Sequence, residues 1–382
     1  MGTTSRSATS TSSSSTERRV LVVKIGTSTI MGAKGPDAAL MGRLADVLAT
    51  LTERHRVVVV SSGAVGTGRW RLNLKGRPRS IPEKQAAAAV GQGILMHLYE
   101  RLLSERGLTS AQLLLTRQDL GDRQRYVNAS NTLGVLLAAN PPVIPIINEN
   151  DSVAIDELKF GDNDTLSALV AVLVDAERLF ILSDIDGLYE ADPRRHPEAA
   201  RIPSVAAITP EIEALAGDAG SDLGTGGMAT KVLAARIATS CGIPLVLLDG
   251  RSPELMLDSL AGEAVGTTFQ ASPNRLEGRK RWLAFGGRLE GRLTLDDGAI
   301  AAIATHGKSL LPAGIREVRG EFGPGALVAL MDANGREVAR GLTNYASEEL
   351  ARIQGRQSAE IEGVLGHKHY DEAIHRNNLV LR

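Results

Sequence analysis

The sequence predicts an α/β protein: a three-layer αβα sandwich around a mainly parallel sheet, followed by a small β-barrel-like module. Short apolar runs alternate with longer helical patterns from about residue 20 to residue 249. These runs are apolar almost throughout, which is typical of parallel strands that helices cover on both faces. After about residue 280 the pattern changes to short strands separated by glycine turns, which indicates a separate β module.

Each apolar run is expected to form one buried strand, and each helical pattern between two runs is expected to cross over the sheet in the right-handed sense. The sequence predicts strands at 20–25, 57–62, 111–116, 143–148, 178–183 and 244–249, and helices at about 37–54, 84–105, 124–139, 164–175 and 228–241.

Two of these helices carry a more specific prediction. In the helix at 84–105, an apolar residue recurs every four positions, and this spacing predicts one packed face made of Val90, Ile94, Leu98 and Leu102. The helix at 164–175 is apolar almost all round, which predicts a central, buried helix.

The predicted domain organisation has five segments. Residues 1–18 are rich in Ser and Thr and too polar to order themselves, so we expect a disordered tail. An α/β domain at 19–267, a linker at 268–280, the β module at 281–356 and a polar C-terminal tail at 357–382 follow.

Composition narrows the class of protein. The chain has 382 residues, with 43 Lys and Arg against 44 Asp and Glu, so its net charge of −1 does not indicate a dedicated nucleic-acid or membrane binder. The single cysteine, Cys241, excludes an internal disulfide framework and fits a reducing cytoplasm. No apolar stretch approaches the roughly 20 residues that span a bilayer. We therefore expect a cytoplasmic protein.

The stretch "GTGGMATK", Gly224 to Lys231, resembles a phosphate-binding loop but does not match the common one. That loop has glycine before its lysine and a hydroxyl residue after it, whereas Thr230 precedes Lys231 here and Val232 follows. The stretch begins a predicted helix, whose first amide groups and dipole favour phosphate. It is therefore expected to be a phosphate site of another design.

Polar residues gather where the predicted strands end. Ligands of open parallel sheets bind beyond the carboxyl ends of the strands. Lys24 lies at the end of the first strand, and a lysine within an apolar strand is costly to bury unless an anion meets it. Two clusters, Asn148 to Asp151 and Asp162 to Asp164, are more polar than a loop requires, although Asp162 or Asp164 could simply cap a helix.

Taken in order, six motifs resemble those of the amino acid kinase family. They are "VVKIGTS", "SSGAV", "INENDSVA", "GDNDTLSALVA", "SDIDGLY" and "GTGGMATK", and the β module is similar to a PUA domain. Within the family, the closest resemblance is to members that use ATP to phosphorylate the side-chain carboxylate of L-glutamate, the first step of proline biosynthesis.

The resemblance implies a role for each matching position. Lys24, Lys231 and Asp164 would be catalytic, the lysines contacting phosphate and Asp164 organising them. Ser62, Asp151 and Asn163 would bind glutamate. ATP would contact Lys24, Ser183, Asp184, Thr225, Gly226, Gly227, Met228, Ala229, Thr230 and Lys231. Mg²⁺ is implied as the cofactor that accompanies ATP, with no protein ligand assigned to it.

The resemblance also implies a homo-oligomer, a dimer or a tetramer, and inhibition by proline. Two other interpretations stay open. The acceptor could be acetylglutamate, aspartate, carbamate or a nucleoside monophosphate, although the paired "NEND" and "GDND" motifs favour glutamate. PUA modules also occur in RNA-associated proteins, but residues 281–382 hold 13 Lys and Arg against 13 Asp and Glu, so nucleic-acid binding is not favoured.

Overall fold

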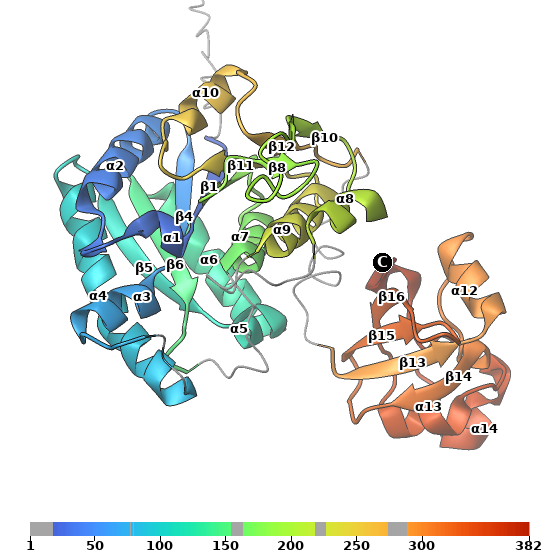
Figure 1. Cartoon of the computed structure of the whole chain (residues 1–382). Helices are drawn as coiled ribbons and strands as arrows, with labels where there is room; N and C mark the ends of the chain where they lie inside the picture. The colour runs from blue at the N-terminus through green and yellow to red at the C-terminus, as the bar shows by residue number, and fades with distance from the viewer. Residues whose placement is uncertain are drawn as a thin grey trace, which may run out of the picture.

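The computed structural model of the chain describes residues 18–76, 78, 80–153, 163–217, 227–273 and 289–381. Its N-terminal part is built on an eight-stranded sheet with the strand order β10-β12-β11-β7-β1-β4-β6-β5 (Figure 1). The last six strands of that order, from β11 to β5, run parallel to their neighbours, whereas β12 runs antiparallel to β11. The predicted, mainly parallel sheet is confirmed.

The six predicted strands are found within two residues of their expected ends. The strands of this sheet are β1 Val20–Ile25, β4 Arg56–Ser61, β5 Thr109–Leu115, β6 Val143–Glu149, β7 Arg178–Ser183, β10 Ser204–Val205, β11 Leu245–Asp249 and β12 Thr267–Phe269. Two short hairpins join β2 Met31–Gly32 to β3 Gly35–Pro36 and β8 Leu188–Tyr189 to β9 Arg201–Ile202.

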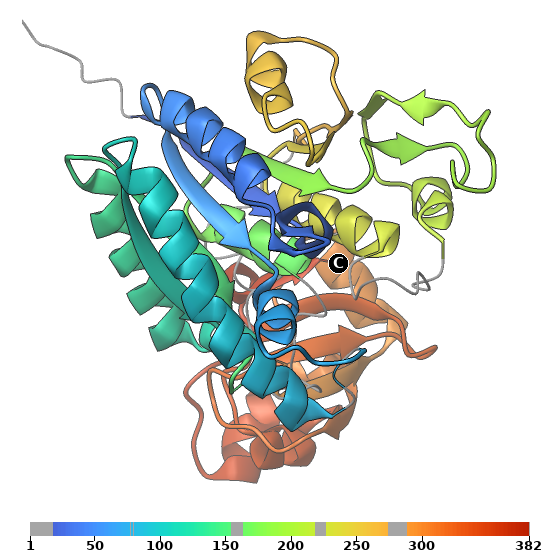
Figure 2. The same ribbon diagram turned by 60° about the vertical axis from the view of Figure 1, so that its left-hand side comes forward.

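Helices cover both faces of the sheet, so the predicted three-layer sandwich is confirmed (Figures 1 and 2). One face packs against α2 Ala38–Thr52, α3 Ala64–Arg71, α4 Ile81–Ser104 and α10 Leu255–Ala261. The opposite face packs against α6 Arg123–Ala138, α7 Asn163–Leu173, α8 Pro210–Leu215 and α9 Met228–Ser240. Two further short helices are α1 Thr27–Ile30 and α5 Arg117–Gly121. The prediction that α7 is a buried helix is confirmed, since its residues from Leu166 to Leu173 are all buried.

Side chains along β1 alternate between the two cores, as the geometry of a strand requires. Leu21, Val23 and Ile25 pack into the core beneath α2 and α4, whereas Val22 packs into the core beneath α7 and α9. The same alternation turns Lys24 toward α7 and α9. The placement of this lysine is therefore set by the period of the strand.

The predicted packed face of α4 is only partly confirmed. Leu102 is buried and Leu98 packs against the same core. Val90 is instead 37% exposed, and Gly91, Leu95 and Tyr99 are buried, one residue further along each turn. The reason is a close crossing between α3 and α4. A Cβ atom on Gly91 would lie 1.8 Å from the carbonyl oxygen of Ala64. The helices pack backbone to backbone there, so the apolar spacing did not identify the buried residues of this part of α4.

Helix α3 was not predicted, because its sequence "AVGTGRWR" contains two glycines, which disfavour a helix. One of them, Gly68, meets α4 from the other side. A Cβ atom at this position would lie 1.7 Å from the carbonyl oxygen of Ala87. The residue that weakens the local helix propensity is thus the one that the tertiary contact requires.

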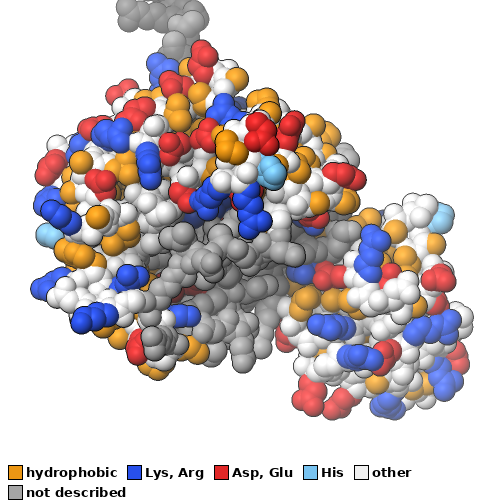
Figure 3. Space-filling model, viewed as in Figure 1, with side chains coloured by type: hydrophobic (Ala, Val, Ile, Leu, Met, Phe, Trp, Pro, Cys, Tyr) orange, Lys and Arg blue, Asp and Glu red, His pale blue; other side chains and the backbone are white. Residues whose placement is uncertain are grey.

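The C-terminal part has a separate core around a five-stranded sheet with the order β14-β13-β15-β16-β17. Within the described residues its outer strands β14 and β17 do not pair, so the sheet is open where a β-barrel-like module was predicted. Acidic and basic side chains are interspersed over the face seen in Figure 3. The elements are β13 Gly291–Leu295, α12 Asp297–Ala304, β14 Ile315–Arg319, β15 Leu327–Met331, β16 Glu337–Leu342, α13 Ser347–Ile353, α14 Ile361–Leu365 and β17 Leu379–Leu381.

Residues 357–381 are part of this module, although the sequence predicted only a polar tail there. Strand β17 pairs with β16, and Ile361, Ile374 and Val380 are buried. These apolar residues are spaced too widely to show a helical or strand period. In the described ranges of the chain, no helix is long and apolar enough to cross a membrane.

The α3–α4 crossing predicts opposite effects for two glycines of one helix. Gly91→Ala should destabilise the protein by about 1–3 kcal/mol or more, because the new methyl group must displace backbone. Gly93→Ala, on the exposed side of α4 with nothing within 4 Å of the new Cβ, should stabilise it by about 0.5–1 kcal/mol. Urea unfolding of both variants measures this, and equal effects would contradict the close contact.

Candidate active site

The polar residues that follow the strands meet at one edge of the sheet. Strands β1, β4, β6, β7 and β11 run parallel, so their carboxyl ends share that edge. The chain passes from β1 to β4 on one side and later returns to β7 on the other, so β1 lies where the strand order reverses. This is where ligands bind in open α/β sheets.

A buried ion cluster lies at this point. The two carboxylate oxygens of Asp164 each contact one lysine: Lys24 Nζ lies 2.5 Å from Oδ1, and Lys231 Nζ lies 3.2 Å from Oδ2. All three side chains are less than 10% exposed. Lys24 comes from β1, Asp164 from the first turn of α7 and Lys231 from the first turn of α9. Thr230 Oγ1 also donates to Asp164 Oδ2, at 2.9 Å.

The lysines keep Asp164 ionised. Burial alone would raise the pKa of this carboxyl, but the ammonium groups of Lys24 and Lys231 outweigh burial and hold the pKa far below its usual range. The three groups together carry one net positive charge. Because the first amide groups of α9 point to the same region, the cluster favours an anion such as a phosphoryl group.

A second polar cluster surrounds Asn163, the residue before Asp164. Its side-chain nitrogen donates to Ser62 Oγ at 2.9 Å, to the Ser61 carbonyl oxygen at 2.9 Å and to Asn148 Oδ1 at 2.8 Å. The structure thus brings Ser62 and Asn163 together, as expected for two residues of one binding site. Asp151 lies in the turn that follows β6, two residues beyond the end of that strand.

Ser183 is the last residue of β7, the strand that pairs with β1 and its Lys24, and Asp184 follows it. Ser183 is buried, and its hydroxyl donates to Asp184 Oδ1 at 3.1 Å. The Asp184 side chain is 45% exposed and pairs with Arg194 at 3.1 Å. Among the residues that the structure describes, no group of three His, Cys, Asp or Glu side chains could hold a metal ion.

The predicted ATP loop is described only in part. Thr225 and Gly226, and the capping candidate Asp162, lie outside the described residues. Gly227 is the N-cap of α9, and Met228 and Ala229 form its first turn. The described part of the loop therefore leads directly into the helix that carries Lys231.

Several neighbours of the site were missed in the sequence. Gln92 of α4 accepts from Asn148 Nδ2 at 2.8 Å, and the buried hydroxyl of Tyr99 lies 3.0 Å from Ser61 Oγ. Burial raises the pKa of Tyr99 to about 12. Gln92 and Tyr99 are seven residues apart, so they share one face of the helix. Polar groups at this spacing within an otherwise apolar face were the available signal.

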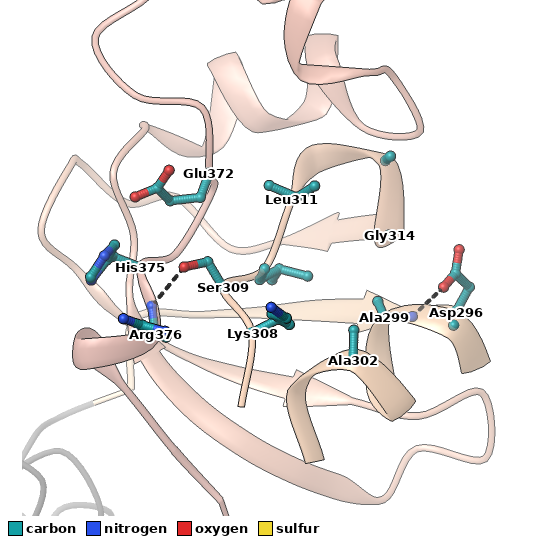
Figure 4. Close-up of a pocket in the computed structure, with 13 residues that line it drawn as sticks. Asp296, Ala299, Ala302, Lys308, Ser309, Leu311, Gly314, Glu372, His375 and Arg376 are labelled. Atoms are coloured by element: carbon teal, nitrogen blue, oxygen red, sulfur yellow. Dashed lines mark hydrogen bonds between the residues drawn. The ribbon is translucent and has the colours of Figure 1, made fainter. Parts of the chain in front are cut away.

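A cavity of about 700 Å³ lies elsewhere, in the C-terminal module. Lys308, His375 and Arg376 approach it from one side, and Asp296 lies at the opposite end (Figure 4). Asp296 caps α12 through the Ala299 amide, so this carboxylate already has a structural role. The cavity shares no residue with the lysine cluster, and its mixed charges do not point to one ligand.

Comparisons with known proteins identify the family of this chain. A family model described as "Amino acid kinase family" matches residues 19–249, and a "PUA domain" model matches residues 291–365. The chain is 51% identical to "Glutamate 5-kinase" of Moorella thermoacetica, over 96% of this chain and 97% of the relative. It is 51% identical to that of Geobacter sulfurreducens over 94% and 97%, and 52% identical to that of Thermosynechococcus vestitus over 95% and 99%.

Because two buried lysines share the carboxylate of Asp164, its removal should cost much more stability than the removal of an exposed carboxylate. Asp164→Asn leaves two buried ammonium groups without their anion and should destabilise the protein by about 3–5 kcal/mol at neutral pH. Asp46→Asn, which breaks an exposed pair with Arg106, should cost much less, because water and salt screen that pair. Denaturant unfolding of both variants gives the two values.

The same variants test the lowered pKa of Asp164. A carboxyl whose pKa is lowered by folding stabilises the protein above its usual pKa of about 4, and this stabilisation is lost as the pH falls. The difference in unfolding free energy between the wild type and Asp164→Asn should therefore shrink below about pH 4. A constant difference would show that Asp164 does not carry this charge.

Proposed function

The chain belongs to the amino acid kinase family, and on this basis we propose that it transfers the γ-phosphoryl group of ATP to the side-chain carboxylate of L-glutamate. The product is L-glutamyl 5-phosphate, and the reaction is the first step of proline biosynthesis. The observation that carries the proposal is the identity of about half of all residues to proteins named glutamate 5-kinase, over nearly the full length of both chains.

The chemistry of this reaction fits a site without a general base. The side-chain carboxyl of glutamate has a pKa of about 4.3, so near pH 7 it is already ionised and can attack phosphorus directly. The obstacle is repulsion between this carboxylate and the γ-phosphate, together with the need to align both groups. Fixed positive charges would reduce the repulsion between the two groups.

Lys24 and Lys231 are proposed to supply those charges from opposite sides of the transferring group. Asp164 would hold both ammonium groups in place, which the distances of 2.5 and 3.2 Å support. Groups fixed before the reaction stabilise developing charge without a reorganisation cost. Thr230 would then act mainly through Asp164, to which it donates, although it was expected to contact ATP.

The remaining site residues are proposed to hold the two substrates. Asp151, Ser62 and Asn163 would read the amino acid end of glutamate, Asp151 being suited to the ammonium group. ATP would lie along the C-terminal end of β7 and the N-terminal end of α9, against Ser183, Asp184 and the loop Thr225 to Lys231. Mg²⁺ needs only one or two carboxylates when phosphates and water supply its other ligands. Asp184, half-exposed beside Ser183, fits that requirement, and the ion would neutralise phosphate charge.

Three expectations about partners and location stay predictions: assembly into dimers or tetramers, inhibition by proline, and action in the cytoplasm. The alternative acceptors and an RNA-associated role are not favoured. The C-terminal module has equal numbers of acidic and basic residues, and Figure 3 shows the two signs interspersed on the face in view.

Hydroxylamine trapping tests the reaction, because hydroxylamine converts an acyl phosphate into a hydroxamate. The purified chain should form hydroxamate only when ATP, Mg²⁺ and L-glutamate are all present. Aspartate, N-acetylglutamate, carbamate and a nucleoside monophosphate, tested by ADP release, should give at least about tenfold lower rates. Folded protein that forms no hydroxamate with glutamate, or that prefers another acceptor, would contradict the proposal.

Removal of either lysine tests the proposed roles. Lys24→Ala and Lys231→Ala should each lower turnover by about 100-fold or more, the usual loss for one electrostatic stabiliser. Each variant leaves a one-to-one pair with Asp164, so both should remain folded. Lys308→Ala, an exposed lysine of the C-terminal module, serves as the matched control and should keep normal turnover. Near-normal turnover in both site variants would remove the lysines from the mechanism.

A further inference from the structure

Three side-chain amides form a chain that leads from helix α4 to the acceptor side of the site. Gln92 Oε1 accepts from Asn148 Nδ2 at 2.8 Å, and Asn148 Oδ1 accepts from Asn163 Nδ2 at 2.8 Å. Only Asn163, at the end of the chain, is expected to contact substrate. Asn148 is 2% exposed, so this link is shielded from water.

Two backbone groups fix the orientation of the side-chain amides in this series. The backbone N–H of Glu149 donates to Asn148 Oδ1 at 2.8 Å, so that oxygen cannot be exchanged with the amide nitrogen. The carbonyl oxygen of Ser61 accepts from Asn163 Nδ2 at 2.9 Å, which fixes the second amide in the same way. Since Asn148 must then donate with its nitrogen, Gln92 has to present its oxygen.

This orientation decides what Asn163 offers to a ligand. Its amide nitrogen is engaged with three protein oxygens, from Ser61, Ser62 and Asn148. Its buried oxygen, Oδ1, has no hydrogen-bond donor among the described residues. A buried acceptor without a donor is costly, so this oxygen is suited to a donor group on the ligand. Near pH 7 the donor of glutamate is its α-ammonium group, because both carboxylates only accept.

The packing of helix α4 places Gln92 close enough to Asn148 for their hydrogen bond. Gly91, the residue before Gln92, packs against the Ala64 carbonyl oxygen with no room for a side chain. Two turns later, Tyr99 contacts Ser61 on the same side of the sheet. Both ends of the segment are thus anchored, which leaves Gln92 within reach of Asn148.

We propose that Gln92 is a positioning residue, which acts through Asn148 to hold the oxygen of Asn163 toward the α-ammonium group of the acceptor substrate. The inference rests on the proposed function, because it takes an α-amino acid as the acceptor. It assigns the recognition of the ammonium group in part to an uncharged oxygen, beside the contribution expected of Asp151.

Two substitutions of Gln92 separate this role from a merely structural one. Gln92→Met keeps the length of the side chain but removes the acceptor, whereas Gln92→Glu keeps acceptor oxygens and has no donor. Binding of L-glutamate and of glutarate, which lacks the amino group, is measured by calorimetry on the full chain without ATP. The quantity compared is the ratio of the two dissociation constants, from which any general effect on carboxylate binding cancels.

The wild type should prefer glutamate over glutarate, Gln92→Met should reduce this preference about fivefold or more, and Gln92→Glu should keep it within about twofold. The ATP dissociation constant and the thermal midpoint should change little in either variant. Equal weakening of both ligands in Gln92→Met, or loss of the preference in Gln92→Glu, would overturn the proposal. So would a wild type that binds glutamate no better than glutarate.

Different results would contradict the proposed function and the proposed role of Gln92. Because calorimetry requires no turnover, a chain that binds glutamate selectively and loses selectivity only in Gln92→Met, yet forms no hydroxamate, would contradict the kinase activity and support the amide chain. Hydroxamate formation with unchanged selectivity in Gln92→Met would support the kinase activity and contradict the proposed role of Gln92.

Discussion

The arrangement of the site depends on one interaction, the sharing of the Asp164 carboxylate by two buried lysines. Lys24 and Lys231 are 207 positions apart in the sequence, and they meet because a strand and two helix starts converge at one edge of the sheet. Neither ammonium group could be buried cheaply without an anion nearby. Asp164 therefore makes burial possible, while the three groups together keep one net positive charge.

The sheet divides the site into two halves. Side chains of one parity along the strands, such as Lys24 and Ser183, face α7 and α9, where phosphate chemistry is proposed. Side chains of the other parity, such as Ser61 and Asn148, face α4 and meet Tyr99 and Gln92. The period of two along each strand is thus enough to turn Lys24 and Ser183 toward one face of the sheet and Ser61 and Asn148 toward the other.

The sequence was sufficient to predict the buried strands and the three layers, because continuous apolar runs are local signals. The meeting of Lys24, Asp164 and Lys231 was implied by the resemblance to the amino acid kinase family. The sequence was not sufficient for α3 or for the first half of the buried face of α4. There the contact is made by glycine backbone, which leaves no apolar period to detect. Gln92 was missed for a related reason, since its importance comes from a partner 56 positions away.

Consecutive residues at the start of α7 reach both polar clusters of the site: Asn163 contacts Asn148, and Asp164 contacts the two lysines. They share one backbone turn, so displacement of either side chain along the helix axis would displace the other. A ligand that orders this turn from one side would reduce the entropic cost of ordering it from the other. Such coupling is reciprocal, so ligands proposed for the two clusters would bind with positive cooperativity inside a single subunit.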